Sequence, residues 1–225
     1  MINKDKWLSR QLKINCYNIS YKSLLNLNLR DKNKYFYSTN TLSNQKLLNL
    51  INKNFLYINT KINYELTLKK SKKLRYDPIF KKSLKFHMKE ISHISKNSFI
   101  DDRFHKDSTI NKKFADQIKK AWVENYFKGK RGDCMFHIEI KNQIVGFILI
   151  KHLSKIISSI DLIAVKKEFR GKNLAKTLIE NICKYLSDNN FQKLILSTQM
   201  NNINSMNLYN SLKFELISID YIFHR

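Results

Sequence analysis

The order of apolar segments after Pro78, the only proline in the chain, constrains the fold more than any other feature of the sequence. Short apolar runs that suit buried strands alternate there with longer stretches in which apolar residues recur every three or four positions. The strand-like runs span residues 134–140, 144–151, 156–165, 193–198 and 214–224, and the helical patterns span 80–95, 111–127, 172–187 and 204–212. Strands with interleaved helices predict an α/β (α+β) fold.

Two of the helical stretches have a clear apolar face. The stretch 111–127 carries Phe114, Ile118, Ala121, Trp122 and Tyr126 on one side. The stretch 172–187 repeats an apolar residue at intervals of four, at Leu174, Leu178, Ile182 and Leu186. One-sided patterns of this kind are typical of helices that pack on a sheet.

The chain before Pro78 is richer in Lys and Asn, and residues 55–68 alternate in part like a strand. The lysine-rich segment 69–78 follows it and ends at the proline, which restricts the backbone at and before itself. We therefore expect a boundary here. The sequence predicts a small N-terminal subdomain at 1–75 and a larger domain at 76–225.

The chain starts with a charged and polar segment, and none of its apolar runs approaches the roughly 18 residues needed to span a bilayer. We therefore expect no signal peptide, no membrane insertion and a cytoplasmic location. Cys16, Cys134 and Cys183 are isolated and odd in number, which favours free thiols in a reducing compartment. The histidines form no metal-ligand spacing, so no metal is expected.

The formal net charge of +24 suggests an anionic partner. The positive residues are mostly lysines, however, and they are spread along the whole chain among abundant Asn and Ile, a mixture typical of AT-rich coding sequences. No known nucleic-acid-binding pattern accompanies them. We therefore expect no nucleic-acid binding, but a general attraction for polyanionic small molecules such as nucleotides.

Residues 168–179, EFRGKNLAKTLI, contain Gly171, one of only four glycines in the chain. The segment joins an apolar strand that ends at Val165 to a helix that starts near Lys172. The first backbone N–H groups of a helix lack internal partners and bind phosphate when the backbone can be approached closely. Gly171 permits that approach, and Arg170 and Lys172 add positive charge. A plain turn that needs glycine is the alternative on this segment alone.

The segment V-x-x-x-x-R-G-x-x-x-A (165–175) and the downstream pattern N-x-x-S-x-x-L-Y-x-x-L-x-F (202–214) together resemble the acyl-CoA signature of the GNAT acetyltransferases. That family usually has glycine where this chain has Asn173 and Lys213, and often proline where it has Lys167. Because Asn is the next most tolerant residue for a left-handed backbone, we expect the loop geometry to persist. The resemblance implies a GNAT-like mixed central sheet flanked by helices, with acetyl-CoA as co-substrate.

The same resemblance assigns roles to individual residues. Backbone N–H groups from Arg170 to Ala175 would hold the CoA pyrophosphate, and the strand before them would pair with the pantetheine arm. The Ile163 N–H would polarise the thioester carbonyl as an oxyanion donor. The implied cofactor-binding residues are Val165, Arg170, Gly171, Lys172, Asn173, Leu174, Ala175 and Asn202.

Tyr209 would protonate the departing thiolate, because a phenol with an ordinary pKa of roughly 10 is a plausible acid for a thiolate of pKa roughly 8.5. Alone, a tyrosine on an amphipathic helix would favour a core position. The attacking amine must be neutral, so a base or a water chain is also needed. Asp161 and Glu139 are candidate bases on central strands, although such carboxylates are more often solvated or paired.

A narrower resemblance concerns the acceptor. The segments DDRFHKD (101–107), WVEN (122–125), STQMNN (197–202) and the terminal YIFHR look like the TDP-fucosamine N-acetyltransferases, with Ser108 in place of that family's proline. Those enzymes acetylate a nucleotide-linked 4-amino-4,6-dideoxygalactose during surface-polysaccharide synthesis. Arg103 would grip the diphosphate with its bidentate fork, and His105 would hydrogen-bond the sugar or the amine. Otherwise both are surface loop residues or caps.

The leading hypothesis is therefore an acetyl-CoA-dependent N-acetyltransferase for a nucleotide-linked aminosugar of the dTDP-4-amino-4,6-dideoxyhexose type, active as a monomer or homodimer. A GNAT enzyme that acetylates a protein N-terminus, a lysine or another small amine is the second. The third is a catalytically silent GNAT-like binding module, which Tyr209 and Asn202 disfavour.

Overall fold

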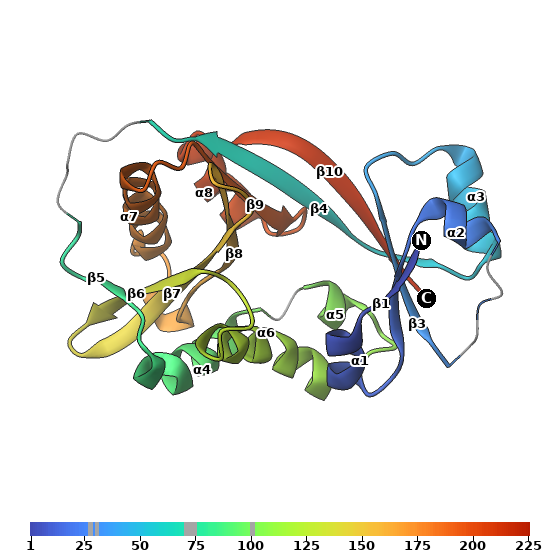
Figure 1. The fold of residues 1–225 in the computed structure, drawn as a ribbon, viewed down its shortest axis with the longest axis horizontal. Helices are drawn as coiled ribbons and strands as arrows, with labels where there is room; N and C mark the ends of the chain where they lie inside the picture. Colours follow the sequence, from blue (N-terminus) through green and yellow to red (C-terminus); the bar gives the residue numbers. More distant parts are fainter. Residues whose placement is uncertain (27–28, 30–31, 70–75, 100–101) are drawn as a thin grey trace.

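The computed structural model describes residues 1–26, 29, 32–69, 76–99 and 102–225 (Figure 1). Within these residues a mixed sheet of ten strands has the order β1-β2-β3-β10-β4-β9-β8-β7-β6-β5. The β2–β3 and β8–β9 pairs are parallel and the other neighbours are antiparallel. The strands are β1 (Ile2–Lys4), β2 (Cys16–Ile19), β3 (Lys34–Thr39), β4 (Leu56–Thr67), β5 (Phe80–Lys82), β6 (Cys134–Ile140), β7 (Gln143–His152), β8 (Ile157–Val165), β9 (Lys193–Gln199) and β10 (Glu215–His224).

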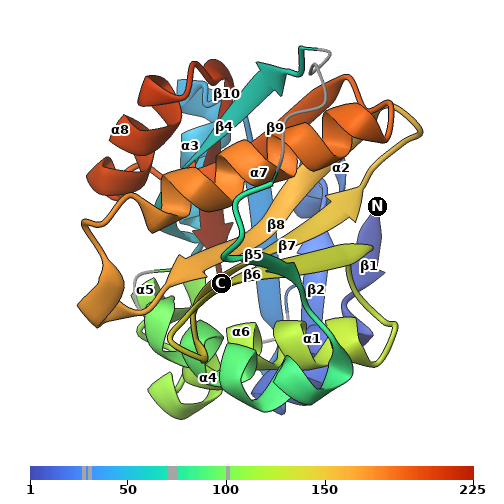
Figure 2. The ribbon, with the colours of Figure 1, turned by 90° about the vertical axis from the view of Figure 1, so that its left-hand side faces the viewer.

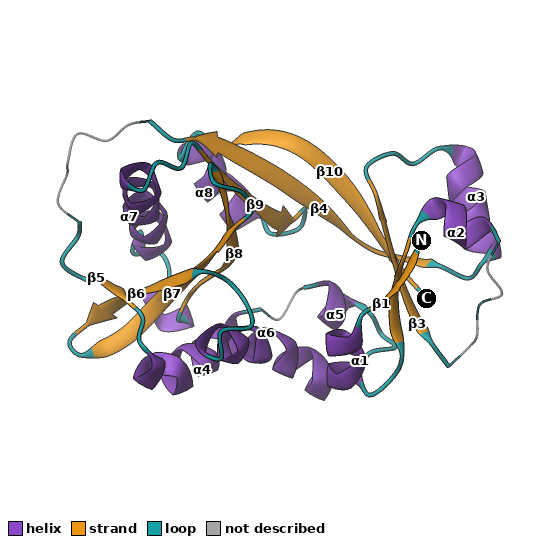
Figure 3. Cartoon of the chain, in the orientation of Figure 1, coloured by secondary structure: helices purple, strands orange, loops and turns teal. Residues whose placement is uncertain are grey.

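Helices cover both faces of this sheet (Figure 3). They are α1 (Lys6–Leu12), α2 (Tyr21–Leu25), α3 (Asn44–Asn52), α4 (Met88–Ser98), α5 (Arg103–Lys106), α6 (Lys112–Phe127), α7 (Leu174–Asp188) and α8 (Ile203–Ser211). Figure 2 shows α7 on one side of β6–β8 and the pair α4 and α6 on the other. The predicted α/β (α+β) fold with flanking helices is confirmed.

Two apolar clusters hold these layers together. On one face Leu178 and Ile182 of α7 pack with Phe136 and Ile148 of the sheet. On the other face Ile91 of α4 and Val123 of α6 pack against Phe147, Leu149 and Leu162. Because every second residue of a strand faces the same layer, β7 supplies fully buried side chains to both clusters.

The predicted helix faces are confirmed for α7 and only in part for α6. The four expected residues of α7 are all buried. In α6 the buried side chains are those of Ala115, Ile118 and Val123. The face is rotated because α6 contacts α1 as well as α4, so its buried stripe is set by two neighbours rather than one.

The strands expected after residue 134 are confirmed within two residues, whereas the helix expected at 80–95 is wrong in its first part. Phe80–Lys82 form β5, which pairs with β6 at the edge of the sheet. Phe80 stacks on Phe136 with ring centres 4.7 Å apart, and this cross-strand contact outweighs the helical spacing of the segment. The helix itself begins at Met88, after a short 3-10 turn at Lys85–His87.

The strand expected at 55–68 is confirmed as β4, which pairs with β9 and β10. The long strands β4 and β10 join the two ends of the molecule in Figure 1, with β1–β3 and α1–α3 at one end. The boundary between 1–75 and 76–225 stays a prediction, and residues 70–75 beside it lie outside the described residues. None of the helices in the described ranges is long and apolar enough to cross a membrane.

Candidate active site

The central irregularity of the sheet lies between β8 and β9. These two parallel strands are in register only from Ile157 opposite Lys193 to Ser159 opposite Ile195. β8 nevertheless continues to Val165, and β9 continues to Gln199. Beyond the last pair, one edge of β8 therefore has no strand beside it in the described part of the chain.

The backbone of β8 is turned toward this open edge by a bulge at Asp161. The register with β7 skips one residue, since Leu149 faces Leu162 and Ile150 faces Ile160. After the bulge, the Lys166 N–H donates to the Val145 carbonyl of β7 at 2.8 Å. Since alternate strand residues present their N–H groups to opposite sides, those of Ile163 and Val165 face the open edge.

The loop after β8 keeps the expected backbone geometry in spite of its unusual residues. Gly171 has φ +76° and Asn173 has φ +58°, so the prediction of a left-handed Asn173 is confirmed. A Cβ atom added to Gly171 would meet nothing within 4 Å. The backbone at Gly171 therefore borders open space. Lys213, the other replacement for a family glycine, is also left-handed, with φ +64°.

The N-terminus of α7 is not capped by a side chain. Asn173 occupies the N-cap position, but its amide makes no capping hydrogen bond, so the first N–H groups of α7 stay available. Arg170 lies just before, where its Nε donates to the Val165 carbonyl at 3.1 Å. Lys172 is exposed. A phosphate group fits this terminus, because it would receive backbone donors, the positive end of a long helix and nearby cations.

The downstream helix α8 differs from α7 in that a side chain caps its N-terminus. The side chain of Asn202 accepts a hydrogen bond from the Ser205 N–H at 3.3 Å and caps α8, while Asn202 itself is exposed. Tyr209 is buried between Tyr64 and Phe214, with ring centres 5.8 Å away in each case. Burial raises the pKa of Tyr209 to about 12, although a hydrogen bond with Ser205 opposes that shift. The phenol is therefore protonated at neutral pH.

One apolar cluster joins the parts that the sequence assigned to the cofactor. Val165, Leu174 and Tyr209 are buried in it, and Ile163 and Ala175 pack against it. The end of β8, the start of α7 and the middle of α8 thus form one unit. Asn202 and the exposed tip of the loop, from Arg170 to Asn173, lie at its surface.

A cavity of about 470 Å³ reaches the point where β8 and β9 separate. Ile160 and Asp161 line it from β8, and Leu196, Ser197 and Gln199 line it from β9. Several further charged or polar side chains line it, from β4 beside β9 and from α5, α6 and the segments next to these helices. These are Asn59, Lys61, Asp102, Arg103, Lys119 and Arg131.

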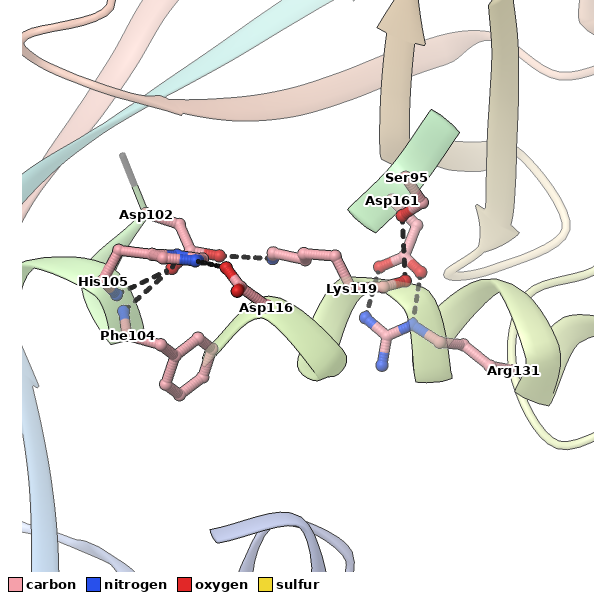
Figure 4. A network of polar contacts seen from close by, with 8 residues as sticks. All are labelled: Ser95, Asp102, Phe104, His105, Asp116, Lys119, Arg131 and Asp161. Carbon is pink, nitrogen blue, oxygen red and sulfur yellow. Dashed lines mark hydrogen bonds and ion pairs between the residues drawn. The ribbon is translucent and has the colours of Figure 1, made fainter. Parts of the chain in front are cut away.

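The sequence prediction placed Arg103 and His105 together at the acceptor, and the structure separates them. Arg103 lines the cavity, where its guanidinium lies 4.7 Å from the ring centre of Phe104. Burial lowers the pKa of Arg103, although the carboxylate of Asp102 opposes that shift. His105 does not line the described cavity. Its Nδ1 and Nε2 lie 2.9 and 3.1 Å from carboxylate oxygens of Asp102 and Asp116 (Figure 4).

Asp102 organises the start of α5. Its Oδ1 accepts hydrogen bonds from the backbone N–H groups of Phe104 and His105, at 2.9 and 3.2 Å. Its Oδ2 is buried and has no hydrogen-bond partner in the described part of the chain. The nearest cation is Lys119, whose Nζ lies 3.8 Å away. Sequence reasoning missed both residues, although a lysine on the apolar stripe of α6 next to Ile118 was a usable signal.

The two carboxylates that the sequence offered as bases are both engaged in ion pairs. Asp161 lines the cavity but accepts two hydrogen bonds from Arg131, from Nε at 2.6 Å and from Nη2 at 2.7 Å. Glu139 pairs with Lys81 at 2.8 Å and does not line the described cavity. Arg131 also lies over the ring of Trp122, at 3.6 Å.

Comparison with known proteins defines the class of enzyme. The sequence matches the acetyltransferase (GNAT) family over residues 94–214, just over half of the chain. The chain therefore belongs to the GNAT acetyltransferases. Members of this family use acetyl-CoA as the acetyl donor.

One curated relative has a named biological role. The chain is 25% identical over 135 residues to the spore coat polysaccharide biosynthesis protein SpsD of Bacillus subtilis (strain 168). The match covers 60% of this chain and 46% of SpsD, so the chain spans less than half the length of that relative.

Solved structures show the same fold at low sequence identity. A conserved protein of unknown function from Staphylococcus epidermidis aligns with a TM-score of 0.64 at 14% identity, over 97% of this chain and 88% of that one. A GCN5-related N-acetyltransferase from Sphaerobacter thermophilus aligns with a TM-score of 0.60 at 12% identity, over 86% of this chain and 59% of that one. The PaiA N-acetyltransferase from Thermoplasma acidophilum, solved with coenzyme A, aligns with a TM-score of 0.50 at 15% identity, over 65% of this chain and 96% of that one.

Proposed function

We propose that this chain transfers the acetyl group of acetyl-CoA to the primary amine of a nucleotide-linked aminosugar, of the dTDP-4-amino-4,6-dideoxyhexose type. The observation that carries the proposal is the position of the charged cavity. It meets the open edge of β8 at Ile160 and Asp161, so a donor laid along that edge and an acceptor in the cavity would have their reacting groups next to each other.

The donor half fits acetyl-CoA through backbone groups. Acetyl-CoA supplies an acetyl group that is activated as a thioester. The uncapped N-terminus of α7, with Gly171 beside it, would hold the pyrophosphate. The outward N–H group of Val165 would pair with the pantetheine arm, and that of Ile163 would stabilise the oxyanion. Tyr209 would give its proton to the departing thiolate.

The acceptor half fits an amine that carries a diphosphate. Arg103, Lys119 and Arg131 bring positive charge to the cavity, and the planar fork of an arginine suits phosphate oxygens. The buried Oδ2 of Asp102 and the buried Nδ2 of Asn59 lack partners in the described part of the chain. Both residues line the cavity, where a polar ligand with donors and acceptors would offer partners.

The relationship to SpsD supports the biological setting of the proposal. That protein is named for spore coat polysaccharide biosynthesis. The resemblance of residues 101–107 and 197–202 to aminosugar acetyltransferases names the same class of acceptor.

Thiol release from acetyl-CoA tests the proposal. Purified protein would be offered dTDP-4-amino-4,6-dideoxygalactose, the same sugar without its nucleotide, a peptide with a free N-terminus, and lysine. We expect saturable release with the nucleotide sugar, and release at least about tenfold slower with the free sugar, because the diphosphate contacts are lost. Equal or faster release with the peptide would favour a protein-acetylating enzyme and contradict the proposal.

A further inference from the structure

Lys119 lies on the wall of the acceptor cavity, in the middle of α6. Its side chain is only 13% exposed, which is rare for a lysine. Figure 4 shows the side chain extending from α6 toward Asp102 at the start of α5. The amine of Lys119 therefore ends inside the cavity rather than in bulk solvent.

The amine of Lys119 is poorly satisfied there. Within the described residues its nearest carboxylate oxygen is Asp102 Oδ2, 3.8 Å away, which is too far for a hydrogen bond. On another side Nζ lies 3.6 Å from the ring centre of Trp122. Nζ therefore has no hydrogen-bond partner among the described residues, and it can form a hydrogen bond with a ligand in the cavity.

The charged groups around Lys119 come from three neighbouring parts of the chain, whereas α4 contributes the hydroxyl of Ser95. Asp102 and Arg103 face it from α5, Asp161 faces it from β8, and Arg131 faces it from the segment after α6. On its own helix Asp116 is engaged with His105, and Lys120 pairs with Glu124. Two cations and two anions therefore surround one buried amine.

The other groups that border the cavity are poor proton acceptors. Both oxygens of Asp161 are held by Arg131, and Lys61 pairs with Asp220 at 2.8 Å. The Oδ1 of Asp102 is committed to the start of α5. Only Lys119 and Asp102 Oδ2 remain available to handle a proton among the described residues that line the cavity.

We propose that Lys119, in its neutral form, is the catalytic base that deprotonates the acceptor amine, with Asp102 Oδ2 as the anion beside it. The proposal rests on the proposed acetyl transfer to an amine. The acceptor ammonium approaches Nζ from the cavity and donates a hydrogen bond to it. The carboxylate of Asp102 balances one positive charge, whichever nitrogen carries the proton.

The step is a simple proton transfer. One N–H bond of the acceptor ammonium breaks and one N–H bond forms at Lys119 Nζ, which becomes an ammonium paired with Asp102. The acceptor nitrogen keeps the electron pair and can attack the thioester carbonyl. After acetylation Lys119 releases its proton to solvent, so the base is ready for the next turnover.

The environment tunes Lys119 for this task. Burial lowers the pKa of Lys119 to about 8; Asp102 opposes the shift, and Arg103 and Arg131 increase it. Near pH 8 about half of the molecules would therefore hold a neutral lysine. An ordinary lysine, with a pKa of roughly 10.4, would be almost fully charged at that pH.

A first experiment needs no acceptor. The protein would be labelled with trace acetic anhydride between pH 6 and 11, and the extent of acetylation at Lys119 would be read by mass spectrometry. We expect half-maximal reactivity near pH 8 in the wild type, and at lower pH in Asp102→Asn, because that variant removes the anion but keeps a side chain that can cap α5. A wild-type midpoint at the ordinary lysine value of roughly 10.4 would overturn the proposal.

A second experiment compares pH profiles of kcat/KM for thiol release with the nucleotide aminosugar. Lys119→Met should lower kcat/KM by ~100-fold or more and lose the rise near pH 8. Lys119→Arg should do the same, because a guanidinium keeps the charge but cannot accept a proton. The ionisation of the acceptor's own amine affects the wild type and all variants equally, so it cancels in the comparison. Lys120→Met, on the same helix beside Glu124, is the matched control and should behave like the wild type.

The two experiments separate the two claims. A wild type that is inactive with the nucleotide aminosugar but labels near pH 8 at Lys119 would contradict the proposed function and support the base. An active wild type whose profile is unchanged in Lys119→Met would overturn the base alone. A folding defect is recognised separately, because Lys119→Met must bind acetyl-CoA like the wild type for its rate to be interpreted.

Discussion

The two halves of the proposed site would recognise their ligands with different parts of the chain. The donor half would use backbone groups of consecutive residues, from the end of β8 through the loop to the start of α7. The acceptor half would use side chains from β4, α5, α6, β8 and the segment after α6. Backbone recognition tolerates substitutions that preserve the dihedral angles, as Asn173 does. Recognition by side chains depends on each residue, so the acceptor half is where relatives would diverge in substrate.

The largest expected effect concerns Tyr209, which is buried in the same apolar cluster as the donor half. Tyr209→Phe keeps the ring in its apolar pocket but removes the proton donor, so kcat should fall by ~100-fold or more. The dissociation constant for acetyl-CoA should not change. Since burial holds the pKa of Tyr209 at about 12, the wild type should show no loss of activity from this group between pH 7 and 9. An unchanged kcat would exclude it as the acid.

The next effect tests the donor half alone. Gly171→Val should weaken acetyl-CoA binding by at least about tenfold in isothermal titration calorimetry, because the side chain would occupy the space beside the α7 terminus. Gly129→Val is the matched control, since Gly129 also has a positive φ and open surroundings. Both variants should lose about 1–2 kcal/mol of unfolding free energy. Equal acetyl-CoA affinities in the two variants would contradict the phosphate-binding assignment.

The acceptor half has the complementary test. Arg103→Ala should raise KM for the nucleotide aminosugar by about tenfold and spare KM for acetyl-CoA, since a charged hydrogen bond contributes about 1.5–3 kcal/mol. Arg170→Ala, in the donor loop, should show the reverse pattern. If both variants raised both constants equally, the two halves would not be separate sites.

The smallest effect concerns backbone strain. Lys213→Gly should raise the unfolding free energy by about 0.5–1 kcal/mol, because relief of the left-handed strain exceeds the added entropy of the unfolded chain. Lys176→Gly, in the first turn of α7, should instead lose up to about 1 kcal/mol. Urea denaturation measures both. A loss of stability in Lys213→Gly would mean that this lysine makes contacts that outweigh its strain.

The same contrast explains how much the sequence could predict. Local patterns predicted the helices and strands from residue 111 onward, because periodicity and loop residues act over short distances. The left-handed Asn173 followed from residue type alone. The six elements before residue 54 were not predicted, since short strands such as Ile2–Lys4 have too few residues for a pattern. The partnership of Asp102 with Lys119, and of Arg131 with Asp161, depends on chain packing that no local pattern encodes.

His105 is a single residue that shows the same limit of prediction from local sequence. Its place in a motif suggested contact with the sugar, but both of its ring nitrogens lie beside carboxylates. A direct contact with the acceptor would require one of those interactions to break. The structure therefore favours a positioning role, in which His105 orients Asp102 toward the cavity.

Hydrogen exchange read by mass spectrometry tests the central claim most directly, namely that donor and acceptor meet where β8 and β9 separate. Acetyl-CoA should slow exchange in residues 160–176, which include the open edge of β8 and the start of α7. The nucleotide aminosugar should slow exchange in residues 102–122 instead. Protection by acetyl-CoA that left residues 160–176 unchanged would contradict the account.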